Sequence, residues 1–133
     1  MHRRKSYRDH ASLICVISEG KTVFVRGNKE PPLLKFPGGH RIGRESPRRT
    51  ASRELKGETG LIVRPDQLFF IDCFDLGTHD KYFFGAYLKE LHGLLQVGDD
   101  GEEVVTLPVG ELKAHEAEIM SDHADILRRF GYL

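Results

Sequence analysis

The chain has 133 residues, of which 39% are hydrophobic and 30% are charged, and its 20 basic and 20 acidic residues leave no formal net charge. This size and composition predict a single globular domain over residues 1–133. The balanced charge argues against a global field for nucleic acid or a membrane surface, and no apolar run is long enough to span a bilayer. Cys15 and Cys73 lie in apolar runs and no signal-peptide pattern precedes them, so we expect free thiols and a cytoplasmic protein.

The N-terminal third of the chain predicts a flexible start followed by paired strands. Residues 1–10 are basic, and we expect them to form a flexible segment. The next segment, 11–18, is apolar and rich in β-forming residues, and a short turn connects it to a second such segment at 22–27. This pattern predicts a β-hairpin. Residues 33–36 are a short extended run that a Pro-Gly-Gly turn ends.

The most regular helix of the chain is predicted at about 47–59. Ser46 is a natural N-cap, and Pro47 fits the first helical position. Gly60 fits the position after the helix, where a left-handed residue commonly ends it. Both ends of this helix are therefore marked by residues with a known physical role.

The second half of the chain alternates strand and helix patterns. Segments 68–74 and 81–88 are dense in aromatic and β-branched residues and predict antiparallel strands. A short strand is predicted at 103–107, and 110–130 shows a helical pattern that Ser121 could break as a second N-cap. This order predicts an α/β fold with a mixed sheet between helices.

Two glutamates on the predicted helix suggest metal chemistry. Glu54 and Glu58 are four residues apart and therefore project from one face of the helix. Mg²⁺ takes oxygen ligands and is usually held by one or two carboxylates together with substrate phosphate oxygens. A carbonyl at the Gly38-Gly39 turn can approach the same ion, because glycine allows close backbone contact. Two glutamates four residues apart are by themselves more often solvated surface residues. The metal-site interpretation therefore depends on the spacing of all the charged and glycine residues between Gly39 and Leu61.

That spacing resembles the Nudix box, G-x5-E-x7-R-E-U-x-E-E-x-G-U, in which U is a bulky aliphatic residue. The matching positions are Gly39, Glu45, Arg53, Glu54, Leu55, Glu58, Gly60 and Leu61. The chain departs from the box at Gly57, where the family has the first of two paired glutamates and commonly a metal ligand. The resemblance implies a Nudix-like α/β/α sandwich over most of the chain.

The resemblance also implies a function and roles for the box residues. Nudix proteins typically use Mg²⁺ or Mn²⁺ to hydrolyse a diphosphate bond in a nucleoside diphosphate linked to another moiety. Glu54, Glu58 and the Gly39 carbonyl would bind the metal, and Glu54 could instead orient the attacking water. Arg53 would act beside Glu54 in catalysis, with Glu45 as its partner. Gly38 and Gly60 would support the backbone around the site.

Residues outside the box are candidates for the remaining roles. The general base in the family is often a glutamate beyond the box, and the candidates here are Glu103 and Glu102, either of which could replace the carboxylate missing at position 57. The candidates for phosphate binding are Arg26, Arg41 and Arg44, although each alone is more often a surface charge.

Two functions remain open at this point. The first is the metal-dependent pyrophosphohydrolase acting on a small nucleotide derivative. The second is a catalytically weakened Nudix domain that binds a nucleotide or a protein partner without turnover, which Gly57 favours. The resemblance leaves a homodimer open as well.

Overall fold

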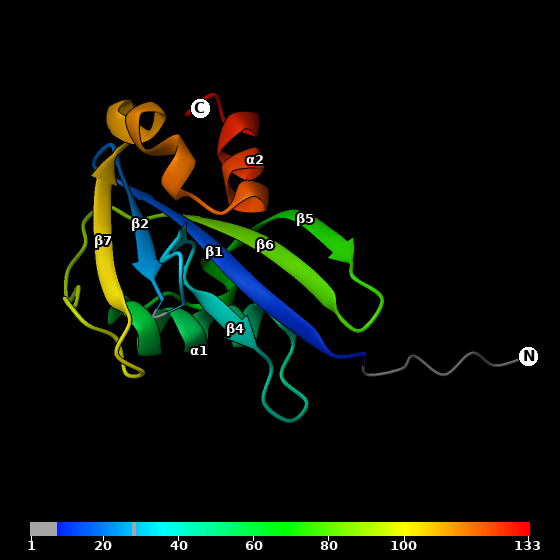
Figure 1. Ribbon diagram of the computed structural model, residues 1–133. Helices are drawn as coiled ribbons and strands as arrows, with labels where there is room; N and C mark the ends of the chain where they lie inside the picture. The colour runs from blue at the N-terminus through cyan, green and yellow to red at the C-terminus, as the bar shows by residue number, and fades with distance from the viewer. Residues whose placement is uncertain (1–7, 28) are drawn as a thin grey trace, which may run out of the picture.

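The computed structural model of the protein describes residues 8–27 and 29–133 (Figure 1). The predicted flexible segment 1–10 falls largely on residues 1–7, which lie outside the described residues, whereas His10 already begins the first strand. The helices and strands, in chain order, are β1 (His10–Ser18), β2 (Lys21–Arg26), β3 (Leu34–Lys35), β4 (Gly38–His40), α1 (Pro47–Thr59), η1 (Pro65–Gln67), β5 (Phe69–Asp75), β6 (Asp80–Tyr87), β7 (Glu103–Pro108), η2 (Val109–Glu118) and α2 (Ser121–Arg129), where η denotes a 3-10 helix.

All seven strands belong to one mixed sheet. Its main path runs β3-β2-β1-β6-β5, with β4 paired to β1 and β7 paired to β2. Strands β1 and β6 are parallel, and the other pairs are antiparallel, including the predicted pair β5 and β6. The predicted hairpin of β1 and β2 is confirmed, but it pairs only through Ile17–Thr22 and Ser18–Lys21. Beyond those pairs, β1 leaves β2 and pairs with β4.

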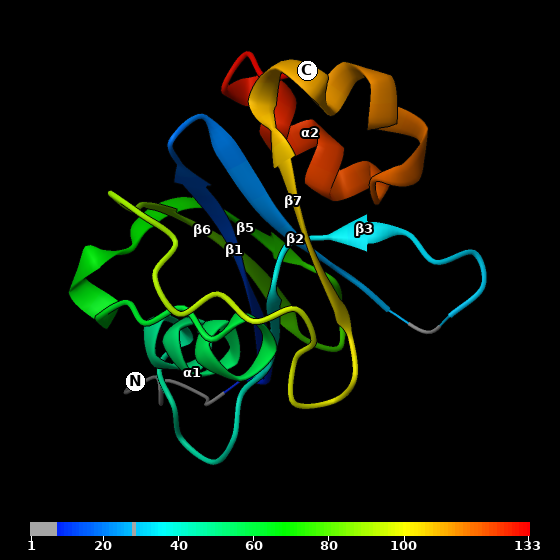
Figure 2. The ribbon, with the colours of Figure 1, turned by 90° about the vertical axis from the view of Figure 1, so that its left-hand side faces the viewer.

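Helices cover both faces of the sheet, which confirms the predicted α/β/α sandwich. Figures 1 and 2 show α1 against one face, with η2 and α2 against the other. Strand β1 lies between two cores because successive side chains point to opposite faces. Leu13 and Cys15 pack in the cluster that includes α2, whereas Ile14 and Val16 pack in the cluster that includes α1.

Helix α1 begins and ends where the capping residues predict. The Ser46 hydroxyl accepts a hydrogen bond from the Arg49 backbone N–H at 3.2 Å, and Pro47 is the first helical residue. Gly60 has φ of 81°, and its N–H donates to the Lys56 carbonyl at 2.8 Å. None of the helices among residues 8–27 and 29–133 is long and apolar enough to cross a membrane.

The prediction of a turn at the Pro-Gly-Gly sequence is wrong. Gly38 and Gly39 lie in β4, opposite Leu13 and Ser12 of β1. A Cβ on Gly38 would lie 2.1 Å from the Ser12 carbonyl oxygen, so only glycine lets the two strands approach this closely. The glycines therefore serve close strand packing rather than chain reversal.

The predicted helical segment 110–130 is divided by extended residues. Ile119 forms a bridge with Leu34 of β3, and the Met120 N–H donates to the Leu34 carbonyl at 2.9 Å. This pairing with the sheet interrupts the helical pattern. Helix α2 then has Met120 as its N-cap, and Ser121 is its first residue rather than its cap.

Candidate functional site

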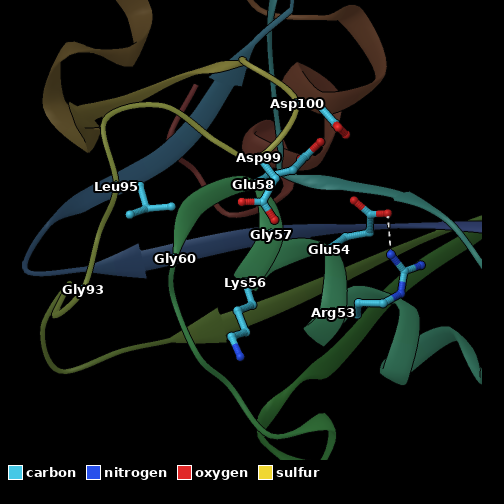
Figure 3. Close-up of a pocket in the computed structure, with 10 residues that line it drawn as sticks. All are labelled: Arg53, Glu54, Lys56, Gly57, Glu58, Gly60, Gly93, Leu95, Asp99 and Asp100. Atoms are coloured by element: carbon cyan, nitrogen blue, oxygen red, sulfur yellow. Dashed lines mark hydrogen bonds and ion pairs between the residues drawn. The ribbon is translucent and has the colours of Figure 1, made fainter.

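The two glutamates of the box line one open pocket beside α1. The pocket has a volume of about 650 Å³, and its walls come from α1 between Arg53 and Gly60 and from the loop 93–100 (Figure 3). Glu54 and Glu58 project into it from consecutive turns of the helix, as their spacing requires. The structure therefore places the predicted metal carboxylates at a single cavity.

Glu58 is a buried carboxylate held by the backbone of β4. Its side chain is largely shielded, with the residue only 7% exposed, and its Oε1 accepts a hydrogen bond from the Gly38 N–H at 2.9 Å. The pKa of Glu58 is raised to about 7, mainly by burial, and the charges of Glu54 and Glu102 act in the same direction. The Gly38 N–H and the charge of Lys35 act in the opposite direction. Such a group exchanges its proton near neutral pH.

Glu54 lies against the backbone of Gly39. A Cβ on Gly39 would lie 2.7 Å from Glu54 Cδ and 2.8 Å from Glu54 Oε1, so any side chain at this position would displace the carboxylate. The Arg53 Nη1 donates to Glu54 Oε1 at 2.9 Å. Of the three predicted metal-binding residues, Glu54 and Glu58 line the pocket, and Gly39 lies directly behind Glu54 without lining the pocket itself.

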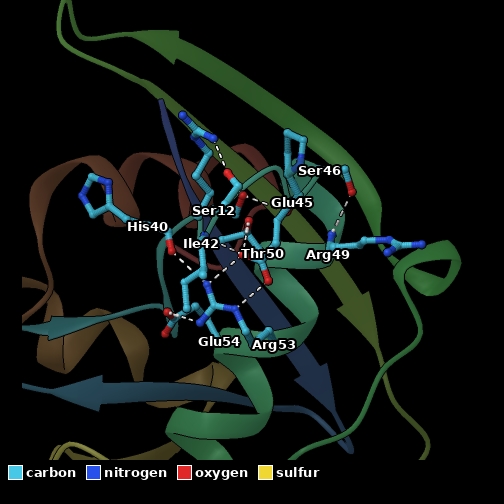
Figure 4. A network of polar contacts seen from close by, with 12 residues as sticks. Ser12, His40, Ile42, Glu45, Ser46, Arg49, Thr50, Arg53 and Glu54 are labelled. Atoms are coloured by element: carbon cyan, nitrogen blue, oxygen red, sulfur yellow. Dashed lines mark hydrogen bonds and ion pairs between the residues drawn. The ribbon is translucent and has the colours of Figure 1, made fainter. Parts of the chain in front are cut away.

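Arg53 ties the loop before α1 to the helix (Figure 4). Its Nε and Nη2 donate to the two carboxylate oxygens of Glu45 at 2.7 and 2.9 Å, and Nη2 also donates to the His40 carbonyl at 2.9 Å. Glu45 Oε1 accepts further hydrogen bonds from the Ile42 N–H at 2.8 Å and the Thr50 hydroxyl at 3.1 Å. The hydrogen bond from Arg53 is the main reason why the pKa of Glu45 falls to about 2. Glu45 thus stays ionised as an anchor for the arginine.

The two downstream glutamates have different surroundings. Glu103 is exposed and pairs with Arg26 at 3.5 Å. Glu102 has a buried Oε2 with no hydrogen-bond partner among the described residues, and its charge raises the pKa of Glu58. Glu102 itself lines a second pocket, with Leu33, Lys35 and Met120 among its other walls, and is not among the residues that line the pocket of Glu54 and Glu58.

The three candidate phosphate-binding arginines do not line the pocket of Glu54 and Glu58. Arg26 pairs with Glu103 on β7, and Arg41 pairs with Asp9 at 3.3 Å. Arg44 is an exposed residue of the loop before α1. None of the three is among the described residues that line the pocket of Glu54 and Glu58.

Sequence reasoning missed the part that the loop 93–100 plays. Asp99 and Asp100 line the pocket, and the Asp99 N–H donates to the Gly57 carbonyl at 2.9 Å. The acidic run at 99–103 was a signal of unusual charge, but nothing in that run indicates that it folds back onto α1. Within the described residues, no three His, Cys, Asp or Glu side chains gather closely enough to form a ready metal cage.

Similar solved structures share this architecture. A NUDIX-family hydrolase from Clostridium perfringens superposes with a TM-score of 0.75 at 15% identity, covering 92% of this chain and 94% of that one. An Ap4A hydrolase from C. elegans gives 0.70 at 16% identity, with 91% and 95% covered. A bifunctional NMN adenylyltransferase/ADP ribose pyrophosphatase from Francisella tularensis, complexed with AMP and a manganese ion, gives 0.75 at 20% identity, with 92% and 41% covered.

Because these solved structures share only 15–20% sequence identity with the chain, their similarity establishes its fold but not its family. The family is established by the sequence comparison. No curated protein matches the chain. The family model of the NUDIX domain matches residues 7–130, which is nearly the whole chain and includes every residue of the box. The chain therefore belongs to the NUDIX domain family of hydrolases.

Proposed function

We propose that the protein is a Mg²⁺- or Mn²⁺-dependent pyrophosphohydrolase that cleaves a diphosphate bond in a nucleoside diphosphate linked to another moiety. The observation that carries this proposal is that Glu54 and Glu58 line one pocket, with the Gly39 backbone packed against the Glu54 carboxylate. The cytoplasmic location and a homodimer remain predictions of the sequence.

The residues at the pocket fit a hard divalent cation. The available donors are carboxylate and backbone oxygens, which Mg²⁺ and Mn²⁺ prefer. Glu102 lies outside the lining of this pocket, but its charge acts on Glu58, and its buried Oε2 has no hydrogen-bond partner among the described residues. The open arrangement also suits Mg²⁺, which keeps several waters and shares its ligands with substrate phosphates.

The side chains near the pocket have separate proposed roles in the reaction. When bound, a divalent cation supplies positive charge against the phosphate oxygens that would otherwise repel a nucleophile. Arg53 holds the Glu54 carboxylate in one orientation toward the pocket. Glu102 is the candidate general base, because its unpartnered carboxylate oxygen can accept a proton from water.

The substrate class is a nucleotide derivative with at least two linked phosphates. Two proteins of similar fold are an Ap4A hydrolase and an enzyme with ADP ribose pyrophosphatase activity. We propose the same broad class here, without a preference among its members. The phosphate-binding roles of Arg26, Arg41 and Arg44 stay predictions, and substrate closure would have to bring these residues toward the pocket.

The test is a hydrolysis assay with dinucleoside polyphosphates, ADP-ribose and nucleoside triphosphates, in Mg²⁺, in Mn²⁺ and in EDTA. We expect turnover only with metal, and a loss of about tenfold or more in kcat for Glu54→Gln and Glu58→Gln. Glu102→Gln should lose about 100-fold, whereas the matched variant Glu103→Gln should stay within a few-fold of the parent. Turnover that EDTA leaves intact would refute the proposal, and equal losses at 102 and 103 would remove Glu102 as the base.

A further inference from the structure

Lys35 is a basic side chain that acts on two pockets. It lines the second pocket, a cavity of about 480 Å³ that it shares with Glu102. Its positive charge also acts on Glu58, which lines the pocket of the two box glutamates. Lys35 is therefore a cation that belongs to one pocket and is felt in the other, beside the proposed cation site.

The chain around β3 directs the Lys35 side chain toward the face of the sheet that α1 covers. Successive side chains of an extended backbone point to opposite faces. The neighbours Leu34 and Phe36 are both fully buried in the core on the α2 side. Lys35 lies between them and therefore points to the other side, where Glu58 accepts the hydrogen bond of the Gly38 N–H.

The backbone that carries Lys35 is held in place by its neighbours. Lys35 pairs with Val25 of β2. The next residue, Phe36, donates its backbone N–H to His123 Nδ1 at 2.8 Å. These contacts fix the backbone at position 35, so the position of the ammonium group varies only through the four-carbon side chain. A lysine on a fixed strand thus presents its charge within a limited region beside the site.

The ammonium group of Lys35 keeps its hydrogen-bond donors for a ligand. No ion pair or side-chain hydrogen bond joins it to another residue within 8–27 and 29–133. An ammonium group has three N–H donors and no acceptor, so the matching ligand is an anion or a carbonyl-like oxygen. Because Glu30 and Glu102 line the same pocket, a free anion would meet negative charge there. A phosphate that a divalent cation has already partly neutralised meets less repulsion.

We propose that Lys35 binds a phosphate oxygen of the substrate, next to the cation that Glu54 and Glu58 hold. This inference rests on the proposed metal-dependent function. It gives the site a phosphate-binding residue, which the three candidate arginines do not supply from the lining of the pocket. Lys35 orients the phosphate and neutralises part of its charge, and both effects favour the attack of water on phosphorus.

Calorimetric titration with methylenediphosphonate in the presence of Mn²⁺ tests the proposal without measuring turnover, because this diphosphate analogue cannot be hydrolysed. Lys35→Met removes the charge and keeps a long unbranched side chain, and should weaken binding of the analogue by about 10- to 100-fold. Lys35→Arg keeps the charge and should retain most of the affinity. Lys29→Met is the matched control, because Lys29 lines the same pocket from the exposed loop after β2, and should cost about fivefold or less.

Titration with Mn²⁺ alone separates a lost phosphate contact from a damaged site. Lys35→Met should bind Mn²⁺ at least as tightly as the parent does, because removal of a nearby positive charge favours a cation. Weaker binding of both Mn²⁺ and the analogue would assign Lys35 a structural role and overturn the proposal. Lys35→Gln removes the same charge with a polar side chain and repeats the comparison, and circular dichroism confirms that each variant is folded.

The outcomes also separate this inference from the function beneath it. Equal affinities of Lys35→Met and the parent for methylenediphosphonate, in a protein that needs Mn²⁺ to bind it, would overturn the role of Lys35 and leave the hydrolase proposal intact. An equal loss in Lys29→Met would do the same. A parent protein that binds neither Mn²⁺ nor the analogue would refute the metal-dependent function and this inference with it.

Discussion

Arg53 holds both carboxylate oxygens of Glu45 with its Nε and Nη2, and it still has Nη1 free to hold Glu54. One planar guanidinium therefore connects the loop before α1 to a carboxylate of the pocket. A fork of this geometry specifies direction as well as distance, which a single ammonium group cannot do. The position of Glu54 relative to the pocket thus depends on how Glu45 anchors Arg53.

Arg53→Lys should damage turnover more than substrate binding. Lysine cannot hold Glu45 and Glu54 together, so we expect kcat to fall by about 10- to 100-fold with a smaller change in KM. The lost hydrogen bonds should also lower the free energy of unfolding by about 1–2 kcal/mol. Steady-state kinetics and urea unfolding measure the two effects. Arg49→Lys on the exposed side of the same helix is the control, and a matching loss there would show that the fork is unimportant.

Gly39→Ala should disturb the pocket through a single methyl group. The new Cβ would meet the Glu54 carboxylate at 2.7–3.0 Å, so that carboxylate has to move. We expect Mn²⁺ affinity to fall by about tenfold, because metal sites tolerate little displacement of a ligand. Gly110→Ala is the matched control, since a Cβ there would meet nothing within 4 Å. Unchanged Mn²⁺ binding in Gly39→Ala would mean that Glu54 is not placed by β4.

Glu58→Gln should stabilise the metal-free protein above pH 7. The folded pKa of Glu58 is about 7, above the ordinary value of 4.5, because the group is buried. Between these values the unfolded chain releases a proton that the folded chain keeps, so this group lowers stability as pH rises. Glutamine does not titrate, so the variant does not lose stability in this way as pH rises. In EDTA, the difference in unfolding free energy between variant and parent should grow from pH 4.5 to 7 and then level off.

Addition of Mn²⁺ should reduce the difference in unfolding free energy between Glu58→Gln and the parent, because the ion binds the folded parent more tightly than the folded variant. Stability curves of parent and variant that run parallel across the whole pH range would contradict a raised pKa at Glu58.

His123 should make the protein less stable in mild acid. The ring is 1% exposed, and its Nδ1 accepts the Phe36 N–H at 2.8 Å, so it is held as the neutral base. Burial lowers its pKa and outweighs the opposing charge of Asp122. Below about pH 6.5 the unfolded chain takes up a proton that the folded chain refuses, so stability falls as pH falls.

The comparison is with His123→Gln, whose amide oxygen can accept the same hydrogen bond. Whatever its absolute stability, this variant should lose less unfolding free energy between pH 7 and pH 5 than the parent does. An equal loss in both proteins would mean that His123 does not titrate differently on unfolding.

The sequence was most informative where structure is local. The cap residues Ser46 and Gly60 defined α1, and the four-residue spacing of Glu54 and Glu58 put both carboxylates on one face, because helical geometry depends on neighbours alone. The contact of Asp99 with Gly57 joins residues 42 positions apart through backbone hydrogen bonds, and a backbone donor leaves no trace in residue type. The turn predicted at Gly38 and Gly39 of β4 was wrong because glycine occurs both in turns and where two strands pack closely, and residue type alone does not distinguish the two.

Four even-numbered residues of β1 contact or pack beneath α1, the helix that carries Glu54 and Glu58. Ile14 and Val16 belong to the core beneath α1, the Ser12 hydroxyl donates to the Pro47 carbonyl at 2.8 Å, and the His10 ring meets the Thr50 hydroxyl at 3.1 Å. Inserting or deleting one residue in β1 would exchange the side chains offered to the two cores. Such a change of register would disturb the packing of α1 and of α2 at the same time, so neither helical layer can be altered alone through β1.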